Sequence, residues 1–336
     1  MEKKNAVTIK DVAERAGVAI STVSRVLNNL DRVSDETRNK VKKATEELGF
    51  VKNSFAASLK NGNTQMVIVV VPDIINECYT AIIQGVEEVA AARGYCTLVF
   101  ATEEDKEKER ELFAGKVSKI IEGVILFPAN DDIEFLRSIE KPVVFVDRCI
   151  IGNDRPSVVI DNYKGSYLAT ERLIKSGHKK IGLLIGSVTF NIGHERMRGF
   201  RQAMSDYGIE VQEQYLKYTT WYQEDGYRCT RELMEMECPP TAIYASNNLL
   251  CMGCIEALND MKIRIGKDIS VIGFDDTILA RRMDPGITVI SRETTEMGRL
   301  GAVKLFDILE NRQSELEKHV VLDVELVERN SVVDIR

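Results

Sequence analysis

The chain of 336 residues has no long apolar run and few histidines. No stretch approaches the roughly 20 consecutive apolar residues that a membrane-spanning helix needs. The opening residues, MEKKNAVTIK, lack the apolar core of a secretory signal peptide. The sequence therefore predicts a soluble, cytoplasmic protein with no membrane partner. Its three histidines are far apart in the sequence and do not suggest a metal site.

Cysteines are also few and scattered. The chain has seven of them, an odd number without a repeated spacing, which is typical of reduced thiols in the cytosol. Cys251 and Cys254 have a CxxC spacing, but neither a second such pair nor a histidine pair accompanies them. We interpret them as two buried thiols of one helix rather than as a metal or redox motif.

The signatures of nucleotide-dependent and hydrolytic enzymes are missing. The sequence contains no GxxxxGK[ST] phosphate loop, no GxGxxG after the first predicted strand, no HExxH and no GxSxG. Gly182 and Gly186 fall in the strand pattern IGLLIG, and we interpret them as positions of close backbone packing. This inventory favours a protein that binds without catalysis, and no cofactor is expected.

The formal net charge of −7 is unevenly distributed. Residues 1–64 contain 12 basic and 8 acidic residues, a balance of +4, whereas residues 65–336 contain 33 basic and 44 acidic residues, a balance of −11. A basic head on an acidic body suggests that the head meets an anionic partner such as nucleic acid.

Apolar periodicity predicts three short helices in the first fifty residues. The first begins at Ile9 after a capping-box pattern and ends at Gly17, the second begins at Ile20, and the third extends from Ser34 to Leu48. Only a few residues separate the first two helices. This is the arrangement of a helix-turn-helix.

From residue 66 the pattern changes to short aliphatic runs that alternate with amphipathic helices. One series runs from MVIVVV to PVVFVD and includes an expected helix at 103–118, and a second begins at IGLLIG, includes an expected helix at 195–207 and ends at SVIGFD. Two tandem series predict two doubly wound parallel-sheet subdomains with a cleft at the carboxyl ends of their strands, where small ligands usually bind. The remaining segments can complete either half; they are TVIS, a helix expected at 294–309, and HVVLDVELVER.

Several segments resemble the lactose-repressor and galactose-repressor family of bacterial regulators. In the head these are TIKDVAERAGVAISTVSRVLNN, VSDETRNKV and LGF, and in the body VIDNYKGSYLATERLIKSGHKKIGLLIG, HERMRGFRQAM, AIYASNNLLCMGCIEAL and SVIGFDD. The resemblance covers nearly the whole chain. It implies a helix-turn-helix head (1–52), a hinge helix and linker (53–64) and a body similar to periplasmic sugar-binding proteins (65–336). The subdomains of the body are expected at roughly 65–161 with 291–318 and 162–290 with 319–336.

In that family the second helix lies in the major groove of DNA. Ile20, Ser21 and Arg25 match the positions that read bases, and an arginine can donate to guanine O6 and N7 as a bidentate pair. Ile20 is apolar, so it can touch a thymine methyl but offers no hydrogen bond. The positions that match contacts to the DNA backbone are Thr22, Ser24, Asn28, Ser34, Thr37 and Asn53.

The segment 54–60 matches the hinge helix of the family. It is too short to be stable alone, because isolated helices of fewer than about 12–15 residues are marginal in water. The resemblance implies that it folds on DNA beside the hinge of the dimer mate, with Leu59 as a minor-groove wedge. Lys52 stands where the family usually has proline, and Ala57 where arginine is common. Because the body can set its order, the hinge is the expected switch element.

For the effector, the resemblance points to seven residues of the body. An arginine and an aspartate can bond the adjacent hydroxyls of a sugar while an aromatic face covers the C–H side of its ring. Arg292 replaces a common glutamine, and together with a second arginine it extends the expected ligands from sugars to sugar acids and sugar phosphates. The seven expected effector-binding residues are Arg196, Asp275, Asn247, Trp221, Tyr79, Asp147 and Asp161.

The sequence thus predicts a homodimeric transcriptional regulator, foremost a repressor, that binds a pseudo-palindromic double-stranded DNA operator and responds to a sugar-like effector. Without a leucine-heptad helix at the C-terminus, a dimer is expected rather than a tetramer. Three alternatives remain open. They are a DNA-binding regulator controlled by a partner protein, a sugar-binding protein without DNA function, and a sugar-metabolising α/β enzyme.

Overall fold

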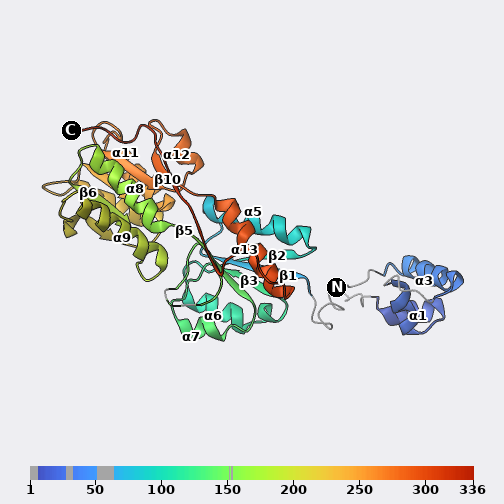
Figure 1. Cartoon of the computed structure of the whole chain (residues 1–336). Helices are drawn as coiled ribbons and strands as arrows, with labels where there is room; N and C mark the ends of the chain where they lie inside the picture. The colour runs from blue at the N-terminus through green and yellow to red at the C-terminus, as the bar shows by residue number, and fades with distance from the viewer. Residues whose placement is uncertain (1–6, 28–32, 51–63, 151, 153) are drawn as a thin grey trace. The chain divides into compact units, whose positions relative to one another are not determined.

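The computed structural model of the chain describes residues 7–27, 33–50, 64–150, 152 and 154–336. The chain divides into two compact units, Met1–Thr64 and Gln65–Arg336 (Figure 1). The expectations for a hinge helix at 54–60, and for Asn28, Asn53 and Leu59, lie outside the described residues.

The first unit is a small helical head. The side chain of Thr8 and the carboxylate of Asp11 form the predicted capping box, and Gly17, at φ +66°, ends the first helix in the left-handed conformation. The apolar faces of the helices meet in one core, which is made of Val12, Ala13, Val23, Val26, Val41 and Ala44. The helices are α1 (Ile9–Ala16), α2 (Ile20–Leu27) and α3 (Asp35–Glu47). The helix-turn-helix prediction is confirmed.

The second unit is an α/β body of two lobes, each built around a six-stranded sheet. The first sheet contains β1 (Met66–Val71), β2 (Cys96–Ala101), β3 (Gly123–Leu126), β4 (Val143–Val146), β5 (Ser157–Ile160) and β11 (His319–Leu322). The second sheet contains β6 (Ile181–Ile185), β7 (Leu216–Tyr218), β8 (Ala242–Ala245), β9 (Ser270–Phe274), β10 (Thr288–Ser291) and β12 (Glu325–Val327).

The strand orders are β11-β5-β4-β3-β1-β2 and β12-β10-β9-β8-β6-β7, so the two sheets repeat one topology. Neighbouring strands are parallel except for the antiparallel pair of β10 and β12. Of the twelve strands in the described residues, six are buried along their whole length and β1 and β10 at every residue but one, which is typical of parallel sheets covered on both faces. The predicted fold class is confirmed.

Helices cover the faces of both sheets (Figure 1). In the first lobe, α5 and α13 pack side by side, and in the second lobe α8 packs on α9 and α10 on α11. The helices of the first lobe are α5 (Glu77–Ala92), α6 (Lys106–Ala114), η1 (Val117–Lys119), α7 (Ile133–Ser138) and α13 (Thr294–Leu309). Those of the second lobe are α8 (Asn162–Lys175), α9 (Asn191–Asp206), η2 (Glu213–Tyr215), α10 (Gln223–Met234), α11 (Asn248–Asp260) and α12 (Ile278–Arg282).

The C-terminal segment contributes one strand to each lobe. In β11, His319 pairs with Ser157 of β5 in the first sheet, and the chain then enters the second sheet as β12. The assignment of residues 319–336 to the second subdomain was therefore wrong for His319–Leu322. The physical reason is that the outer edge of β5 carries backbone groups that need a partner, and β11 supplies it.

The structure confirms the predicted burial of two cysteines in one helix and the predicted close packing at a strand glycine. Cys251 and Cys254 lie buried in α11. A Cβ atom at Gly182 would lie 2.9 Å from Leu233 Cδ1, so this strand position needs glycine for close packing. Across the described residues no group of three His, Cys, Asp or Glu side chains could hold a metal ion. No helix in the same residues is long and apolar enough to cross a membrane.

Candidate functional site

The second helix of the head has one buried and one exposed face. Val23 and Val26 of α2 are buried in the core, whereas Ile20, Ser21 and Arg25 are exposed, Ile20 to 45%. Ser21 and Arg25 are four residues apart and therefore lie one turn apart on the same side of the helix. The structure brings the three predicted base-reading residues together on one exposed surface.

The described residues among the predicted backbone contacts lie on α2 and at the start of α3. Thr22 and Ser24 are half-buried on α2. Ser34 caps α3, because its Oγ accepts a hydrogen bond from the Thr37 backbone N–H at 3.4 Å, and the two hydroxyl oxygens are 2.9 Å apart. Hydroxyls and backbone N–H groups at a helix N-terminus are groups that bind phosphate oxygens.

Two aspartates occupy equivalent positions in the two lobes of the body. Asp147 directly follows β4, and Asp275 directly follows β9. Each has a left-handed backbone conformation, at φ +69° and +73°, and each donates its backbone N–H to the adjacent strand, to Val158 O at 3.0 Å and to Ile290 O at 2.8 Å. The repeated topology therefore aims two buried carboxylates at the same region.

Arg292 joins these two carboxylates. Its Nε lies 2.5 Å from Asp275 Oδ1, its Nη1 contacts Asp147 Oδ1, and the three side chains are each 4% exposed. Burial opposes the ionisation of Asp147 most strongly, but the charges of Arg292, Arg148 and Arg196 together with the hydrogen bond from Arg292 outweigh it and hold the pKa of Asp147 below its usual range. Arg292 is thus occupied by protein carboxylates, contrary to the expectation that it stands beside Arg196 as a cation for an anionic ligand.

Arg196 of α9 lies buried in the second lobe. Its Nε donates to Asn162 Oδ1 at 2.8 Å, its Nη1 contacts the Ser246 carbonyl, and its guanidinium carbon is 3.6 Å from the Phe274 ring centroid and 6.0 Å from that of Trp221. Burial lowers its pKa. Within the described residues no carboxylate lies at ion-pair distance from Arg196, so its charge is balanced only at longer range.

Trp221 lies beside Arg196 and is held by its neighbours. Asn247 donates to Trp221 O at 3.0 Å and caps α11 by accepting from Leu250 N–H at 2.8 Å. A Cβ atom at Gly186 would lie 2.2 Å from Trp221 Cδ2, so the indole packs directly on this glycine. In the described structure, Trp221 Nε1 and Ser246 Oγ are buried without a hydrogen-bond partner. Two unsatisfied polar atoms beside a buried arginine are what a polar ligand would complete.

Tyr79 belongs to a network that the sequence analysis missed. Its hydroxyl accepts from Arg148 Nη2 at 3.4 Å, and Arg148, which is fully buried, makes a bidentate ion pair with Glu104 at 2.8 Å for each bond. The guanidinium carbon of Arg148 lies 5.2 Å from the ring centroid of Phe190 in the other lobe. The available signal was the charged pair Asp147-Arg148 directly after the buried run PVVFV.

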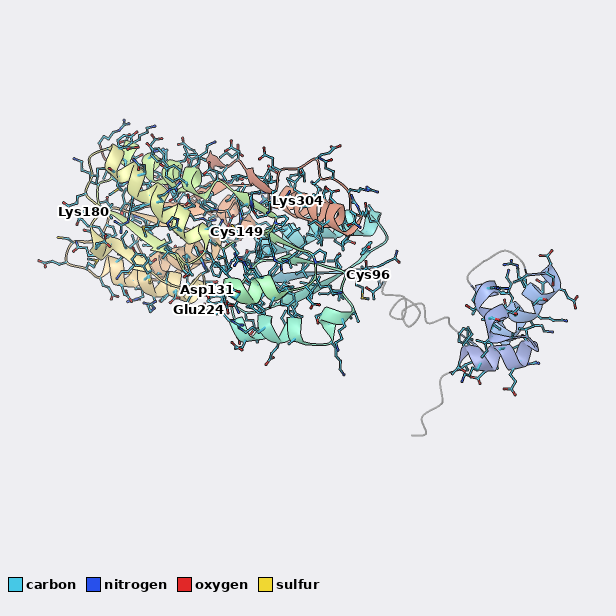
Figure 2. The ribbon with its side chains drawn as sticks, turned by 60° about the horizontal axis from the view of Figure 1, so that its bottom comes forward. Cys96, Asp131, Cys149, Lys180, Glu224 and Lys304 are labelled. Atoms are coloured by element: carbon cyan, nitrogen blue, oxygen red, sulfur yellow. The ribbon has the colours of Figure 1, made fainter. Side chains whose placement is uncertain are left out.

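Two further contacts join the lobes. The amides of Asn76 and Asn248 bond each other in both directions, at 2.8 and 3.3 Å. Cys149, which Figure 2 labels where the lobes meet, donates its backbone N–H to Asn191 Oδ1 at 2.7 Å. The lobes are therefore closed on each other in this structure.

Within the described residues, the hydrogen bonds of Asp161 go to groups other than the expected effector residues. Its carboxylate caps α8 by accepting from Lys164 N–H at 2.8 Å. The structure thus gives Asp161 a local role at the connection between β5 and α8. The other six expected residues lie at the facing edges of the two lobes. There they are Arg196 itself or lie in the networks around Arg292, Arg196 and Arg148.

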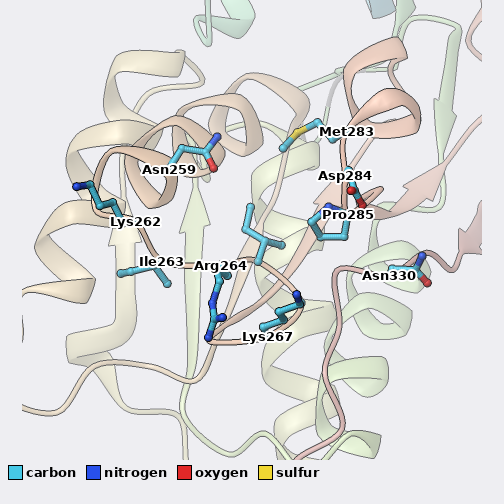
Figure 3. Close-up of a pocket in the computed structure, with 11 residues that line it drawn as sticks. Asn259, Lys262, Ile263, Arg264, Lys267, Met283, Asp284, Pro285 and Asn330 are labelled. Carbon is cyan, nitrogen blue, oxygen red and sulfur yellow. The ribbon is translucent and has the colours of Figure 1, made fainter.

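A separate cavity of about 590 Å³ lies in the second lobe beside the loop that follows α11 (Figure 3). Lys262, Arg264 and Lys267 line one side of it, and Met283 to Pro285 line another. None of the expected effector residues lines this cavity. It is therefore not the site that the resemblance predicts.

Comparisons with known proteins agree with both units of the fold. Residues 8–53 match the family model of bacterial regulatory proteins, lacI family, and residues 170–332 match that of the periplasmic binding protein-like domain. The chain is 34% identical to the HTH-type transcriptional regulator RegA of Clostridium saccharobutylicum, covering 98% of this chain and 100% of the relative. It is 31% identical to the HTH-type transcriptional repressor CytR of Escherichia coli (strain K12), and the match covers 98% of this chain and 97% of the relative.

Solved structures show the same likeness. The lac repressor dimer bound to operator and the anti-inducer ONPF is similar with a TM-score of 0.81 and 25% identity, covering 98% of this chain and 100% of that one. The complex of the transcriptional regulator CelR with cellobiose is similar with a TM-score of 0.71 and 30% identity, and the match covers 97% of this chain and 99% of that one. The two relatives RegA and CytR, which match over nearly the whole length of this chain, carry the names of transcriptional regulators. The chain belongs to the lacI family of bacterial regulatory proteins and is a DNA-binding transcriptional repressor with a helix-turn-helix head and a periplasmic-binding-protein-like body.

Proposed function

We propose that the protein is a homodimeric repressor whose two heads read the half-sites of a pseudo-palindromic operator. The exposed face of α2 carries this proposal, because it presents Ile20, Ser21 and Arg25 together while the opposite face holds the head core. The positive balance of the head supports it, since contacts to phosphates need basic groups. The similar lac repressor structure is a dimer on its operator.

The dimer surface that we propose lies on the body. Ile75, which precedes α5, is 90% exposed, and Ile278 at the start of α12 is 67% exposed. Glu77 Oε1 accepts a hydrogen bond from Ile278 N–H at 2.9 Å, so the start of α12 lies beside the start of α5, two residues along the chain from Ile75. Large exposed apolar side chains of this kind mark interaction surfaces, and the occupant that we assign is a second copy of this chain.

The effector that we propose is a small uncharged polar molecule of the sugar class, bound where the lobes face each other. Trp221 Nε1 and Ser246 Oγ support this site, because both are buried and have no hydrogen-bond partner among the described residues. The balance of buried charges around the site supports an uncharged ligand. Around the site three arginines face three carboxylates, so an anionic ligand would leave an uncompensated charge at low dielectric, whereas an uncharged one would not. The groups are Arg148, Arg196 and Arg292 with Glu104, Asp147 and Asp275. The relative CelR is similar in structure and was solved with the neutral sugar cellobiose.

Fluorescence of the single tryptophan tests the effector site. Neutral sugars, sugar acids and sugar phosphates are added in turn to the full-length protein, and each ligand that changes Trp221 emission saturably is then added to an operator-binding assay. We expect neutral ligands alone to change both signals. The conservative variant Ser246→Ala removes one unsatisfied hydroxyl and should weaken the response without changing operator affinity in the absence of ligand.

Each other outcome excludes part of the proposal. A response restricted to sugar acids or phosphates would contradict the charge argument. Operator binding that no small molecule changes would favour control by a partner protein. Absence of any sequence-specific DNA binding would refute the repressor function. For the dimer, sedimentation velocity of Ile278→Glu should show monomers, and a dimer of unchanged stability would exclude the surface proposed here.

A further inference from the structure

Arg292 lies in the connection between β10 of the second lobe and α13 of the first. It pairs with a carboxylate from each lobe, Asp147 and Asp275. We propose that Arg292 is an internal clamp that keeps the two lobes closed without an effector. The proposal deepens the proposed function, because it assigns the ligand-free state of the same site.

The geometry allows the clamp only when the lobes are closed. A guanidinium has a rigid planar fork, so it can bond two carboxylates at once only while they remain within a few ångströms of it. Asp147 and Asp275 are fixed to their own sheets by backbone hydrogen bonds to Val158 and Ile290. Opening of the lobes would separate the two carboxylates and break at least one of the pairs.

The other contacts between the lobes are weaker in kind. The Asn76–Asn248 amide pair, the Cys149–Asn191 bond and the bond from Ile278 N–H to Glu77 link the lobes without a buried ion pair. Arg148 is buried and charged, but its ion-pair partner Glu104 belongs to the same lobe. Among the described residues, the pairs of Arg292 are therefore the buried ion pairs that join one lobe to the other.

Loss of Arg292 would do more than remove an attraction. Asp147 and Asp275 would then face each other as two buried carboxylates without the cation between them, and like charges in a water-poor site repel strongly. Opening would hydrate both groups. A body without Arg292 should therefore stay open until a ligand closes it, whereas the natural body is closed beforehand.

The clamp also affects ligand selectivity. Asp275 Oδ1 accepts from Arg292 Nε at 2.5 Å, so this carboxylate already shares its charge with a protein cation and has fewer acceptor sites for ligand hydroxyls in the closed body. The remaining groups for a ligand are Arg196 and the buried Trp221 Nε1 and Ser246 Oγ, which have no partner among the described residues. Replacing Arg292 by glutamine should therefore widen the set of hydroxylated ligands that change Trp221 emission.

The test uses the full-length protein and three variants. Arg292→Gln removes the clamp, Arg292→Lys keeps the charge but loses the fork, and Arg264→Gln is the matched control because it removes an exposed arginine pair with Asp268 in the same lobe. Opening is measured by acrylamide quenching of Trp221, which is 7% exposed in the closed body, and independently by the small-angle X-ray scattering radius of gyration.

We expect the closed-to-open ratio of Arg292→Gln to fall by at least about 100-fold, since breaking a buried pair leaves uncompensated charge. Acrylamide quenching of Trp221 and the radius of gyration should both rise in Arg292→Gln. Both values should be intermediate in Arg292→Lys and unchanged in Arg264→Gln. Adding Asp275→Asn to Arg292→Gln removes the repulsion and should return both signals towards those of the natural protein.

A folded Arg292→Gln variant that is as compact and as weakly quenched as the natural protein would refute the clamp. Circular dichroism establishes whether that variant is folded. If it is not, Arg292→Lys decides instead, and the clamp is refuted if the quenching and the radius of gyration of this variant do not differ from those of the Arg264→Gln control. Operator binding by the unmodified protein is measured in parallel, so that failure of the repressor function is distinguished from failure of the clamp.

Discussion

Replacement of Glu109 by glutamine should change the pH dependence of stability. Glu109 of α6 is fully buried, its Oε2 accepts from Ala129 N–H at 2.7 Å, and its Oε1 is without a partner in the described structure. Burial raises the pKa of Glu109 to about 7 from the ordinary 4.5, although Ala129 N–H and the charge of Arg148 oppose the shift. A glutamine reproduces the protonated form in shape and keeps the acceptor for Ala129.

The sign and size follow from proton linkage. Because the folded pKa lies above the unfolded one, the native state holds a proton that the unfolded state releases, and the associated stability is lost as pH rises from about 4.5 through 7. At 1.36 kcal/mol per pKa unit, the difference amounts to about 3 kcal/mol as an upper value. Glu109→Gln should therefore unfold with a free energy about 3 kcal/mol higher than the natural protein at pH 8 and nearly equal to it at pH 4.5.

The assay is urea unfolding followed by far-UV circular dichroism between pH 4.5 and 8.5. The free energy of unfolding of the natural protein is subtracted from that of the variant at each pH. This subtraction cancels the contributions of the other carboxylates, because they titrate in both proteins. Glu111→Gln is the control, because Glu111 is exposed on the same helix and its replacement should give no pH-dependent difference. If the difference in free energy of unfolding between Glu109→Gln and the natural protein stays constant from pH 4.5 to 8.5, that result would falsify the assignment of a buried, protonated carboxyl at Glu109.

Three shorter predictions concern the head and the effector site. Arg25→Ala should weaken binding to the operator by about 1–3 kcal/mol and relax selectivity at one base pair, measured by fluorescence anisotropy against operators altered at single positions. Gly186→Ala should displace Trp221, because its Cβ would lie 2.2 Å from the indole, and emission should shift to the red. Val23→Ala should destabilise the head by about 2 kcal/mol, since Val23 is fully buried, and hydrogen exchange should rise in the head alone. Unchanged selectivity, emission or exchange would contradict the respective prediction.

Most elements were predicted because their signals are local. Apolar periodicity and caps gave α1, α2 and α3 close to their observed bounds, and α13 was predicted at its observed bounds, Thr294–Leu309. The helix expected at 103–118 is shorter, Lys106–Ala114, because Asp105 caps its start by accepting from two backbone N–H groups and Gly115 ends it. The helix expected at Glu195 begins at Asn191 instead, after Phe190.

The site was predicted only in part. The resemblance indicated Arg196, Trp221 and Asn247, which the structure brings together, and Asp147 and Asp275, which it joins through Arg292. It missed Arg148 with Glu104, and Asn76 with Asn248. These partners are 44 and 172 residues apart in the chain, so no local spacing marks them.

The sequence by itself determined the architecture of this protein. Cap residues, the 3.6-residue period of the head and the buried aliphatic runs of the body act over a few residues, so they specify a helix-turn-helix and two parallel sheets without knowledge of distant contacts. Only the tertiary structure decided that β11 belongs to the first sheet and that Arg292 is bound by two carboxylates rather than free for a ligand. Both features depend on which strand edges and charged side chains, distant in the sequence, meet in the folded body. Once they are buried, a backbone edge or a charge without a partner costs so much free energy that each is paired.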